Sequence, residues 1–351
     1  IRWQYGRFGR RMIPDLSLVP SRIPLSLYIH IPWCIKKCPY CDFNSHALPS
    51  DTPFADYVDA LLADASSQVR FLANREISTV FIGGGTPSLL PIDEMARLFA
   101  GLKQILPFAK DCEITLEANP GTLEHAPFES YLDIGINRLS IGVQSFDGAA
   151  LSVLGRILSP DQSIIVIIKA RQAGFERINA DLMYGLPNQT PSLAVQDITT
   201  AIDAGATHIS WYQLTIEPNT AFHRTPPDLP DEETMEAIET AGRDVLTRHG
   251  FDNYEVSAWA GRVDSPCRHN MNYWQFGDYL AIGAGAHGKV TVADQVDLAE
   301  GIYRFQKSRL PKDYLNYQGA PKMVNFEIVA QENLPFEFMM NGLRLKNGVP
   351  K

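Results

Sequence analysis

The sequence predicts an α/β protein, built as an open, partial (β/α)6 barrel that is followed by a small α+β cap. Two observations favour this fold. Between residue 25 and about residue 250, short and almost continuously apolar runs alternate with helix-length stretches, which is typical of parallel strands joined by helices. Beyond residue 250 the apolar runs become shorter and no longer alternate regularly with helix-length stretches. With 351 residues the chain exceeds the size of most single cores, so we expect a barrel over residues 24–250 and a cap over residues 251–351.

The individual elements follow from the apolar pattern. Six runs rich in Ile, Val, Leu and aromatic residues are predicted to be the barrel strands: Leu25–Ile31, Thr79–Gly83, Glu113–Ala118, Arg138–Val143, Ile178–Met183 and His208–Thr215. The predicted helices are Phe54–Asn74, Ile92–Leu106, Ser192–Ala204 and Asp231–His249. In the cap we expect strands at Tyr254–Ala258, Tyr279–Ile282 and Lys289–Val292, and then helices from about Leu298. Barrels of this kind carry their chemistry at the carboxyl ends of the strands.

The two ends of the chain depart from this pattern. Residues 1–11 are rich in arginine and contain no acid, and Met12 offers a natural start just before the first strand. We therefore expect residues 1–23 to be a leader or extension. At the other end, Leu334–Leu345 is predicted to be a helix that enters a further unit, which is truncated at Lys351.

Composition narrows the class of function. A net charge of −9 argues against a general nucleic-acid binder, which needs a surplus of Lys and Arg. No apolar run approaches the roughly 20 residues that span a bilayer. The number of cysteines is odd, and three of the five lie within eight residues. This spacing favours metal ligation in a reducing compartment, and so a cytoplasmic protein, over a set of disulfides.

The cysteine cluster is the strongest single motif. Cys34, Cys38 and Cys41 follow the first predicted strand directly, in the spacing C-x3-C-x2-C. Three thiolates on one tight loop leave the fourth iron of a [4Fe–4S] cube open to another ligand. A structural zinc site needs four ligands, and His30 or His46 could supply the fourth, so a zinc-stabilised structural protein remains an alternative.

Together with its context from Tyr28 through Phe43, this spacing resembles the radical S-adenosylmethionine (SAM) superfamily. It is most similar to the branch that contains the oxygen-independent coproporphyrinogen III dehydrogenase HemN and the haem chaperone HemW, and closer to the latter. The resemblance implies that the three cysteines hold a [4Fe–4S] cluster whose open iron binds SAM. Reduction of SAM then yields methionine and a 5′-deoxyadenosyl radical, which is chemistry supplied by the cofactor.

A second set of residues matches the SAM pocket of this family. The glycine run in Gly83-Gly84-Gly85-Thr86-Pro87 stands at a strand end, where backbone can approach a ligand closely. The resemblance implies that SAM is bound by Gly84, Gly85, Thr86, Glu117, Gln144, Arg156 and Asp181. In this family the glycine element and the acid Glu117 hold the amino end of SAM. Gln144 and Asp181 match the ribose contacts, and Arg156 matches the partner of the SAM carboxylate.

Two features separate a haem carrier from an enzyme. Coproporphyrinogen dehydrogenases have a further cysteine two residues after the third cluster ligand, whereas this chain has Phe43. The chain also contains an H-N-x-x-Y-W element, which is associated with haem binding in HemW and comprises His269, Asn270, Tyr273 and Trp274. If this element is helical, Tyr273 shares a face with His269. A neutral His269 nitrogen could then bind haem iron, with Cys267 and His287 as the other candidate ligands.

The segment Gly283–Gly288 fits G-x-G-x-x-G, but a strand-like run follows it where a dinucleotide fingerprint requires a helix. We expect a tight glycine loop there.

The leading hypothesis is therefore a SAM-binding, HemW-like haem chaperone that passes haem to apo-haem proteins such as respiratory cytochromes. The alternative is an enzyme that decarboxylates coproporphyrinogen III. The family also implies a homodimer and peripheral association with the inner membrane.

Overall fold

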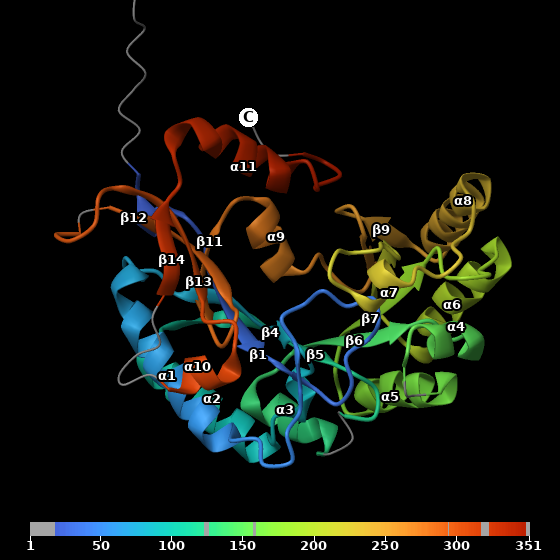
Figure 1. Ribbon diagram of the computed structural model, residues 1–351, viewed down its shortest axis with the longest axis horizontal. Helices are drawn as coiled ribbons and strands as arrows, with labels where there is room; N and C mark the ends of the chain where they lie inside the picture. The colour runs from blue at the N-terminus through green and yellow to red at the C-terminus, as the bar shows by residue number, and fades with distance from the viewer. Residues whose placement is uncertain (1–17, 123–125, 157–158, 294, 317–322, 349–351) are drawn as a thin grey trace, which may run out of the picture.

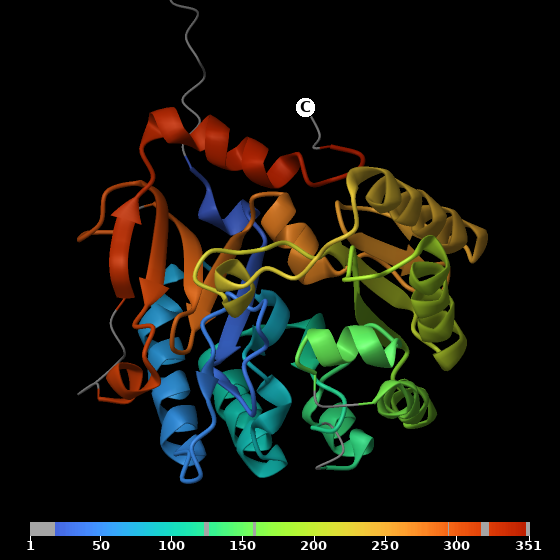
Figure 2. The same cartoon turned by 45° about the vertical axis from the view of Figure 1, so that its right-hand side comes forward.

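The computed structural model describes residues 18–122, 126–156, 159–293, 295–316 and 323–348. Most of the predicted leader, residues 1–17, lies outside the described residues. Over the described residues the chain forms one large mixed sheet with helices on both sides (Figures 1 and 2).

The sheet has 12 strands in the spatial order β14-β13-β12-β11-β1-β4-β5-β6-β7-β8-β10-β9. Their bounds are β1 Leu25–Ile31, β4 Ile77–Gly84, β5 Phe108–Ala118, β6 Arg138–Gln144, β7 Arg177–Tyr184, β8 His208–Gln213, β9 Phe251–Asn253, β10 Ala258–Gly261, β11 Asp278–Ile282, β12 His287–Val292, β13 Gly301–Lys307 and β14 Met323–Ile328. A separate pair, β2 (Trp33–Cys34) and β3 (His46–Ala47), lies in the loop after β1.

The six predicted barrel strands are confirmed, and each neighbouring pair from β1 to β8 is parallel. The strand β11 was expected, but its place was not: it pairs in parallel with β1 and extends the barrel sheet. Strands β12 to β14 continue that edge in antiparallel order, and β10 and β9 extend the other edge. Strands from the C-terminal part of the chain therefore extend both edges of the barrel sheet.

The helices of eight or more residues are α1 (Phe54–Gln68), α2 (Ile92–Ile105), α5 (Pro160–Gln172), α6 (Pro191–Ala204), α8 (Glu232–Arg248) and α11 (Leu334–Gly342). The shorter ones are α3 (Phe128–Ile134), α4 (Gly148–Val153), α7 (Ala221–Arg224), α9 (Arg268–Trp274) and α10 (Pro311–Leu315). Helices α1, α2, α3 and α5 cover one side of the sheet, while α9 and α11 lie on the other (Figure 1). Among the helices that the structure describes, none combines the length and apolar character needed to cross a bilayer.

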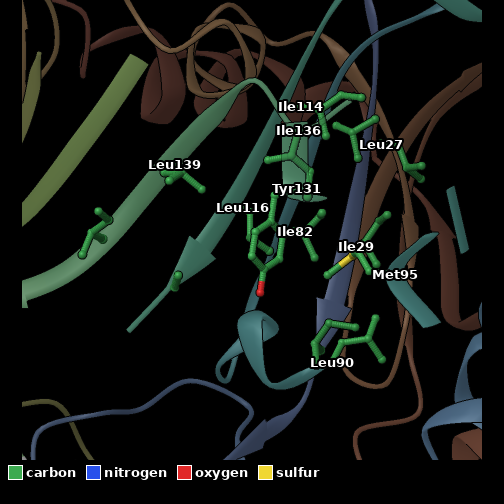
Figure 3. Close-up of a cluster of buried hydrophobic side chains, with 14 of the residues drawn as sticks. Leu27, Ile29, Ile82, Leu90, Met95, Ile114, Leu116, Tyr131, Ile136 and Leu139 are labelled. Carbon is green, nitrogen blue, oxygen red and sulfur yellow. The ribbon is translucent and has the colours of Figure 1, made fainter. Parts of the chain in front are cut away.

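The core forms between the parallel strands and their covering helices (Figure 3). Leu27 and Ile29 of β1 and Ile82 of β4 are fully buried, and Met95 of α2 and Tyr131 of α3 pack in the same core cluster. Strands that are buried on both faces have near-continuous apolar sequences, which explains why these elements were predictable.

The cap departs from its prediction in two places. Tyr254–Ala258 is not a strand, because its backbone turns: the Tyr254 N–H donates to the Ala258 carbonyl, and the Val256 N–H donates to the Arg344 carbonyl. Of the helices expected from about Leu298, α10 and α11 are present, but the strands β13 and β14 were not predicted. In β13 the buried residues alternate with less buried ones, the period of two that a half-buried strand requires.

Helix α11 and the residues after it cross from one end of the sheet to the other. The helix follows β14 in sequence, whereas Leu345 forms a bridge with Glu255 beside β9 and β10. Figure 2 shows this segment running above α9. The Arg304–Glu337 ion pair holds its first half to β13, and Arg344 lies over the Trp274 ring at 4.4 Å. The segment thereby spans the open side of the curved sheet.

Candidate functional site

The three clustered cysteines lie on the loop between β1 and β3, at the carboxyl end of the first barrel strand. The Cys41 N–H donates to the Cys38 carbonyl, which closes a tight turn. The thiol of Cys34 is 3.5 Å from the hydroxyl of Thr86, in the loop after β4. Arg156 places a guanidinium nitrogen 3.8 Å from the Cys38 sulfur. The cysteine loop is thus joined to the loop after β4 and to the segment between α4 and α5.

All the residues predicted to hold the cluster and SAM line one cavity of about 680 Å³, which we call the cluster-side cavity. They are Cys34, Cys38, Cys41, Gly84, Gly85, Thr86, Glu117, Gln144, Arg156 and Asp181. All of them except Arg156, which follows α4, come from β4, β5, β6 and β7 or from the loops after β1 and β4, so the expected gathering at one rim of the barrel is observed.

Neighbouring atoms leave no room for a side chain at Gly84 or Gly85. Gly84 has φ +113°, and a Cβ atom there would lie 2.6 Å from the His30 ring. A Cβ at Gly85 would lie 2.5 Å from the Trp33 carbonyl oxygen. The Gly84 N–H donates to Glu117 at 3.2 Å, which orients that carboxyl group in the cavity. Any larger residue at Gly84 or Gly85 would displace the loop next to the cysteines.

Gln144 ends β6 in a left-handed backbone conformation, with φ +69°. Such a conformation costs a non-glycine residue about 1–3 kcal/mol and is concentrated at functional sites. Its Nε2 donates to the Tyr212 hydroxyl at 3.3 Å, but its Oε1 is buried without a partner among the described residues. The strained backbone therefore presents an unsatisfied acceptor at the cluster-side cavity.

The two remaining polar residues are held by neighbours. Asp181 accepts from Ser140 at 3.1 Å and from Asn179 at 2.8 Å, and burial raises its pKa. Arg156 donates to the Asn119 side chain at 2.7 Å and to the Gly142 carbonyl. Both side chains are fixed before any ligand arrives, which lowers the entropic cost of binding.

A second cavity, of about 620 Å³, adjoins the first and shares Asp42, Phe43, Gly84 and Glu117 with it. We call it the aromatic cavity, because its walls include Tyr28, Phe43, Tyr273, Trp274, Phe276 and Tyr279. The predicted helix of the H-N-x-x-Y-W element is confirmed as α9. It places Tyr273 and Trp274 on the aromatic cavity, but not His269 or Asn270.

His269 is buried, and both of its ring nitrogens are used within the protein. Its Nδ1 lies 2.8 Å from the Thr79 hydroxyl, which itself donates to Ser26, so Nδ1 carries the proton. The Nε2 atom accepts from the Tyr273 hydroxyl at 2.7 Å. Burial lowers the pKa of His269 to about 3, which keeps the ring neutral. Both nitrogens of His269 are therefore occupied by protein partners and its ring packs against the sheet, so His269 offers no free nitrogen to haem iron in this arrangement.

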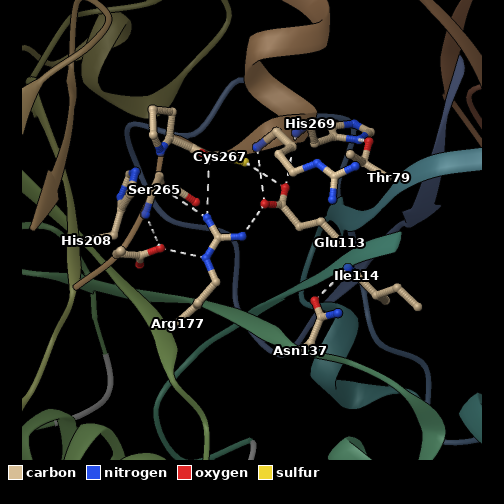
Figure 4. Close-up of polar contacts among 12 residues, drawn as sticks. Thr79, Glu113, Ile114, Asn137, Arg177, His208, Ser265, Cys267 and His269 are labelled. Carbon is tan, nitrogen blue, oxygen red and sulfur yellow. Dashed lines mark hydrogen bonds and ion pairs between the residues drawn. The ribbon is translucent and has the colours of Figure 1, made fainter. Parts of the chain in front are cut away.

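A buried carboxylate on β5 holds the start of α9 (Figure 4). Glu113 accepts from the backbone N–H of His269 at 3.1 Å and of Arg268 at 3.2 Å, and forms an ion pair with Arg177. Arg177 also pairs with Asp264. A negative charge at the amino end of a helix satisfies free N–H groups and the helix dipole.

The other two candidate haem ligands differ in their access to the aromatic cavity. The Cys267 thiol is fully buried and lies 3.6 Å from Glu113, away from the aromatic cavity, and burial raises its pKa to about 11. His287, at the start of β12, does line the cavity.

Comparison with known proteins shows which family the chain belongs to. The model of the radical SAM superfamily matches residues 28–198. The chain is 48% identical to the "Heme chaperone HemW" of Escherichia coli strain K12 over 93% of this chain and 84% of the relative. It is 47% identical to the protein of that name in Haemophilus influenzae, over 95% of this chain and 86% of the relative. Among solved structures it resembles HemN, the coproporphyrinogen III oxidase of Escherichia coli, with a TM-score of 0.78, 25% identity, and coverage of 92% of this chain and 76% of that one.

The chain belongs to the HemW family of radical SAM proteins.

Membership of the radical SAM superfamily implies a [4Fe–4S] cluster and SAM. The cluster-side cavity fits this pair of cofactors, because it combines three cysteines on one turn with the unsatisfied oxygen of Gln144. Within the described ranges, no three His, Cys, Asp or Glu side chains lie close enough to share a single metal ion. A four-iron cube is larger than one ion and takes thiolates that lie further apart. The two histidines of the zinc alternative are engaged elsewhere, His30 with Tyr28 and Asn44, and His46 with the Arg309 carbonyl.

Several residues of this radical SAM site were missed by the sequence reasoning. Asn119 bridges Thr86 and Arg156, and Tyr212 holds Gln144. Asn119 stands two residues after Glu117, so the end of β5 offered a signal for it. Tyr212 lies near the end of β8, where polar residues of such barrels gather, and could have been found by the same rule.

The buried carboxyl group of Glu117 can be tested in the cofactor-free protein through the pH dependence of its stability. Burial, and secondly the charge of Asp181, raise the pKa of Glu117 to about 8. Between the unfolded pKa of about 4.5 and this value, unfolding releases the proton, so the free energy of unfolding falls as pH rises and levels off above pH 8. Each unit of pKa shift changes the free energy of unfolding by about 1.4 kcal/mol. The effect of Glu117 is smaller than its full shift implies, because its carboxyl group lines an open cavity.

We therefore expect Glu117→Gln to stabilise the cofactor-free protein by about 1–3 kcal/mol at pH 8.5, and by almost nothing near pH 4.5. Urea denaturation at several pH values measures this difference. A constant difference across the pH range would show that Glu117 is not the titrating group.

Proposed function

We propose that this protein is a SAM-binding [4Fe–4S] haem carrier, which binds haem in the aromatic cavity and delivers it to apo-haem proteins. The observation that carries the proposal is the second cavity itself: six aromatic side chains surround a volume suited to a ligand of drug size, directly beside the cluster-side cavity. The name of the 48% identical relative, "Heme chaperone HemW", supports haem as the ligand.

The same geometry supports the assignment of the first cavity to the cofactors. We propose that Cys34, Cys38 and Cys41 hold the cluster, which supplies an electron to SAM when both are bound. The remaining residues bind and orient SAM. Gln144 and Asp181 accept from its hydroxyl groups, Glu117 and the Gly84–Gly85 backbone hold its amino end, and the fork of Arg156 suits its carboxylate.

The second candidate is decarboxylation of coproporphyrinogen III, because the solved structure of HemN is similar over 92% of this chain. Phe43 argues against it. The dehydrogenases carry a cysteine at that place, whereas the Phe43 side chain is 62% exposed and lies on the walls of both cavities. An exposed phenyl ring offers contact to a flat macrocycle and cannot supply a thiol.

We also propose that the recipients are apo-haem proteins, including respiratory cytochromes, and that the carrier is cytoplasmic, dimeric and loosely attached to the inner membrane. The relatives' names support the delivery of haem. Dimer formation and membrane attachment rest on the family resemblance.

Delivery is tested by mixing the haem-loaded protein with vesicles that carry an apo-cytochrome b. We expect the spectrum of the holo-cytochrome to appear faster than from serum albumin loaded with the same haem, because a carrier shortens the time that haem spends free in water. A rate equal to that from albumin would contradict the carrier function.

A further inference from the structure

The aromatic cavity contains one imidazole that the protein itself does not use. His287 begins β12 and is exposed on the cavity wall, and its ring has no hydrogen-bond partner among the described residues. The other histidine on the wall, His30, accepts from Tyr28 at 3.0 Å and donates to the Asn44 carbonyl at 2.8 Å, which engages both of its nitrogens. His287 therefore offers a free imidazole nitrogen, the usual protein ligand of haem iron.

The surroundings of His287 keep its ring neutral. Partial burial, followed by the charges of Arg309 and Arg304, lowers the pKa of His287. A protonated imidazole cannot bind a metal ion, so a neighbourhood that disfavours the proton leaves the nitrogen available at neutral pH.

Arg309, which helps to lower the pKa of His287, is the second unused group. It lies two residues after β13, lines the cavity and is exposed, and its guanidinium has no hydrogen bond or ion pair within the described part of the chain. Arg304, by contrast, is committed to Glu337 and to the Tyr279 hydroxyl. A free guanidinium is suited to a carboxylate, because its planar fork can donate two parallel hydrogen bonds.

The two groups are fixed relative to one another and to the cysteine loop. Asn44, three residues after Cys41, donates from one side-chain nitrogen to the Ala284 carbonyl at 3.1 Å and to the Arg309 carbonyl at 2.9 Å. Gly285 makes this contact close: a Cβ atom there would lie 2.1 Å from the Asn44 nitrogen. The glycine loop before His287 and the turn that carries Arg309 are therefore held together by the loop that carries the cysteines.

We propose that His287 is the axial ligand of haem iron in the aromatic cavity and that Arg309 pairs with a haem propionate. This inference rests on the proposed haem-carrier function and names the residues that perform it. The macrocycle then packs against the aromatic walls, with Tyr273 and Trp274 supplied by α9 and Phe43 by the cysteine loop. In this arrangement His269 is a positioning residue, because it acts by holding the Tyr273 hydroxyl.

The experiment is a haem titration of the full chain with its cluster reconstituted, followed by absorption and resonance Raman spectra. We expect His287→Ala to lose the bands of a histidine-ligated haem and to bind at least tenfold more weakly, and added imidazole to restore the bands. His223→Ala is the matched control: this exposed histidine lies on α7 and lines neither cavity, so the spectrum should not change.

Arg309 is tested separately with two forms of the ligand. Loss of a charge-assisted contact predicts that Arg309→Gln weakens haem binding by about tenfold or more. The affinity for the dimethyl ester of haem, which has no carboxylate, should be the same for this variant and the unchanged protein.

The outcomes distinguish the inference from the function on which it rests. If the unchanged protein binds no haem in a one-to-one complex, the carrier function fails. If it binds haem, but His287→Ala keeps the same spectrum and affinity, the carrier function stands and the assignment of His287 is overturned. An equal loss for haem and for its ester in Arg309→Gln would overturn the propionate contact.

Discussion

Replacing Cys38 by serine should leave the reconstituted protein with almost no iron–sulfur cluster. The three cysteines of the turn supply every protein thiolate of the proposed site, and a serine hydroxyl is a poor ligand for a cluster held by cysteine thiolates. We expect iron to fall from about four atoms per chain to nearly none. Loss of the charge-transfer absorption and of the EPR signal of the reduced cluster would accompany it.

Cys112→Ser provides the matched control for this variant. Cys112 is buried on β5, donates to the Glu113 carbonyl and lines neither cavity. The Cys112→Ser variant should therefore bind as much iron as the unchanged protein. A full cluster in Cys38→Ser, or an equal loss in both variants, would contradict the assignment of the turn.

The second large effect is expected for Glu113→Ala. This carboxylate is buried, satisfies two N–H groups at the start of α9 and pairs with Arg177. Its removal leaves both N–H groups without their acceptor. It also leaves the half-buried Arg177 with Asp264 as its remaining carboxylate partner. We expect the free energy of unfolding to fall by about 2–4 kcal/mol, measured by urea denaturation.

The same variant should weaken haem binding, since α9 carries Tyr273 and Trp274 to the aromatic cavity. The control is Glu94→Ala, which removes a surface ion pair with Arg97 and should cost less than about 1 kcal/mol. Equal destabilisation by the two substitutions would show that the buried network does not hold α9.

The parts of the protein that were predictable from the sequence depend on local chemistry. The cysteine turn, the glycines at Gly84 and Gly85 and the acid Glu117 each directly follow or end an apolar strand, and parallel strands bring their carboxyl ends to one rim. The sequence order of these motifs therefore already implied a shared cavity. Strand β13 was missed although its alternating burial shows a period of two.

The role of His269 was not predictable in the same way. Its ring is enclosed because Thr79 of β4 and Glu113 of β5, which are far away in the sequence, anchor α9 to the sheet. No local pattern around the histidine reveals those partners. The availability of His287 likewise depends on contacts from Asn44, more than two hundred residues earlier in the chain.

The measurement that tests the central claim most directly is one anaerobic assay of the reconstituted protein with SAM, a reductant and coproporphyrinogen III, followed by haem titration of the same sample. We expect one haem bound per chain and no protoporphyrinogen. Formation of the decarboxylated product, without stoichiometric haem binding, would contradict this expectation and make the protein a coproporphyrinogen dehydrogenase despite Phe43.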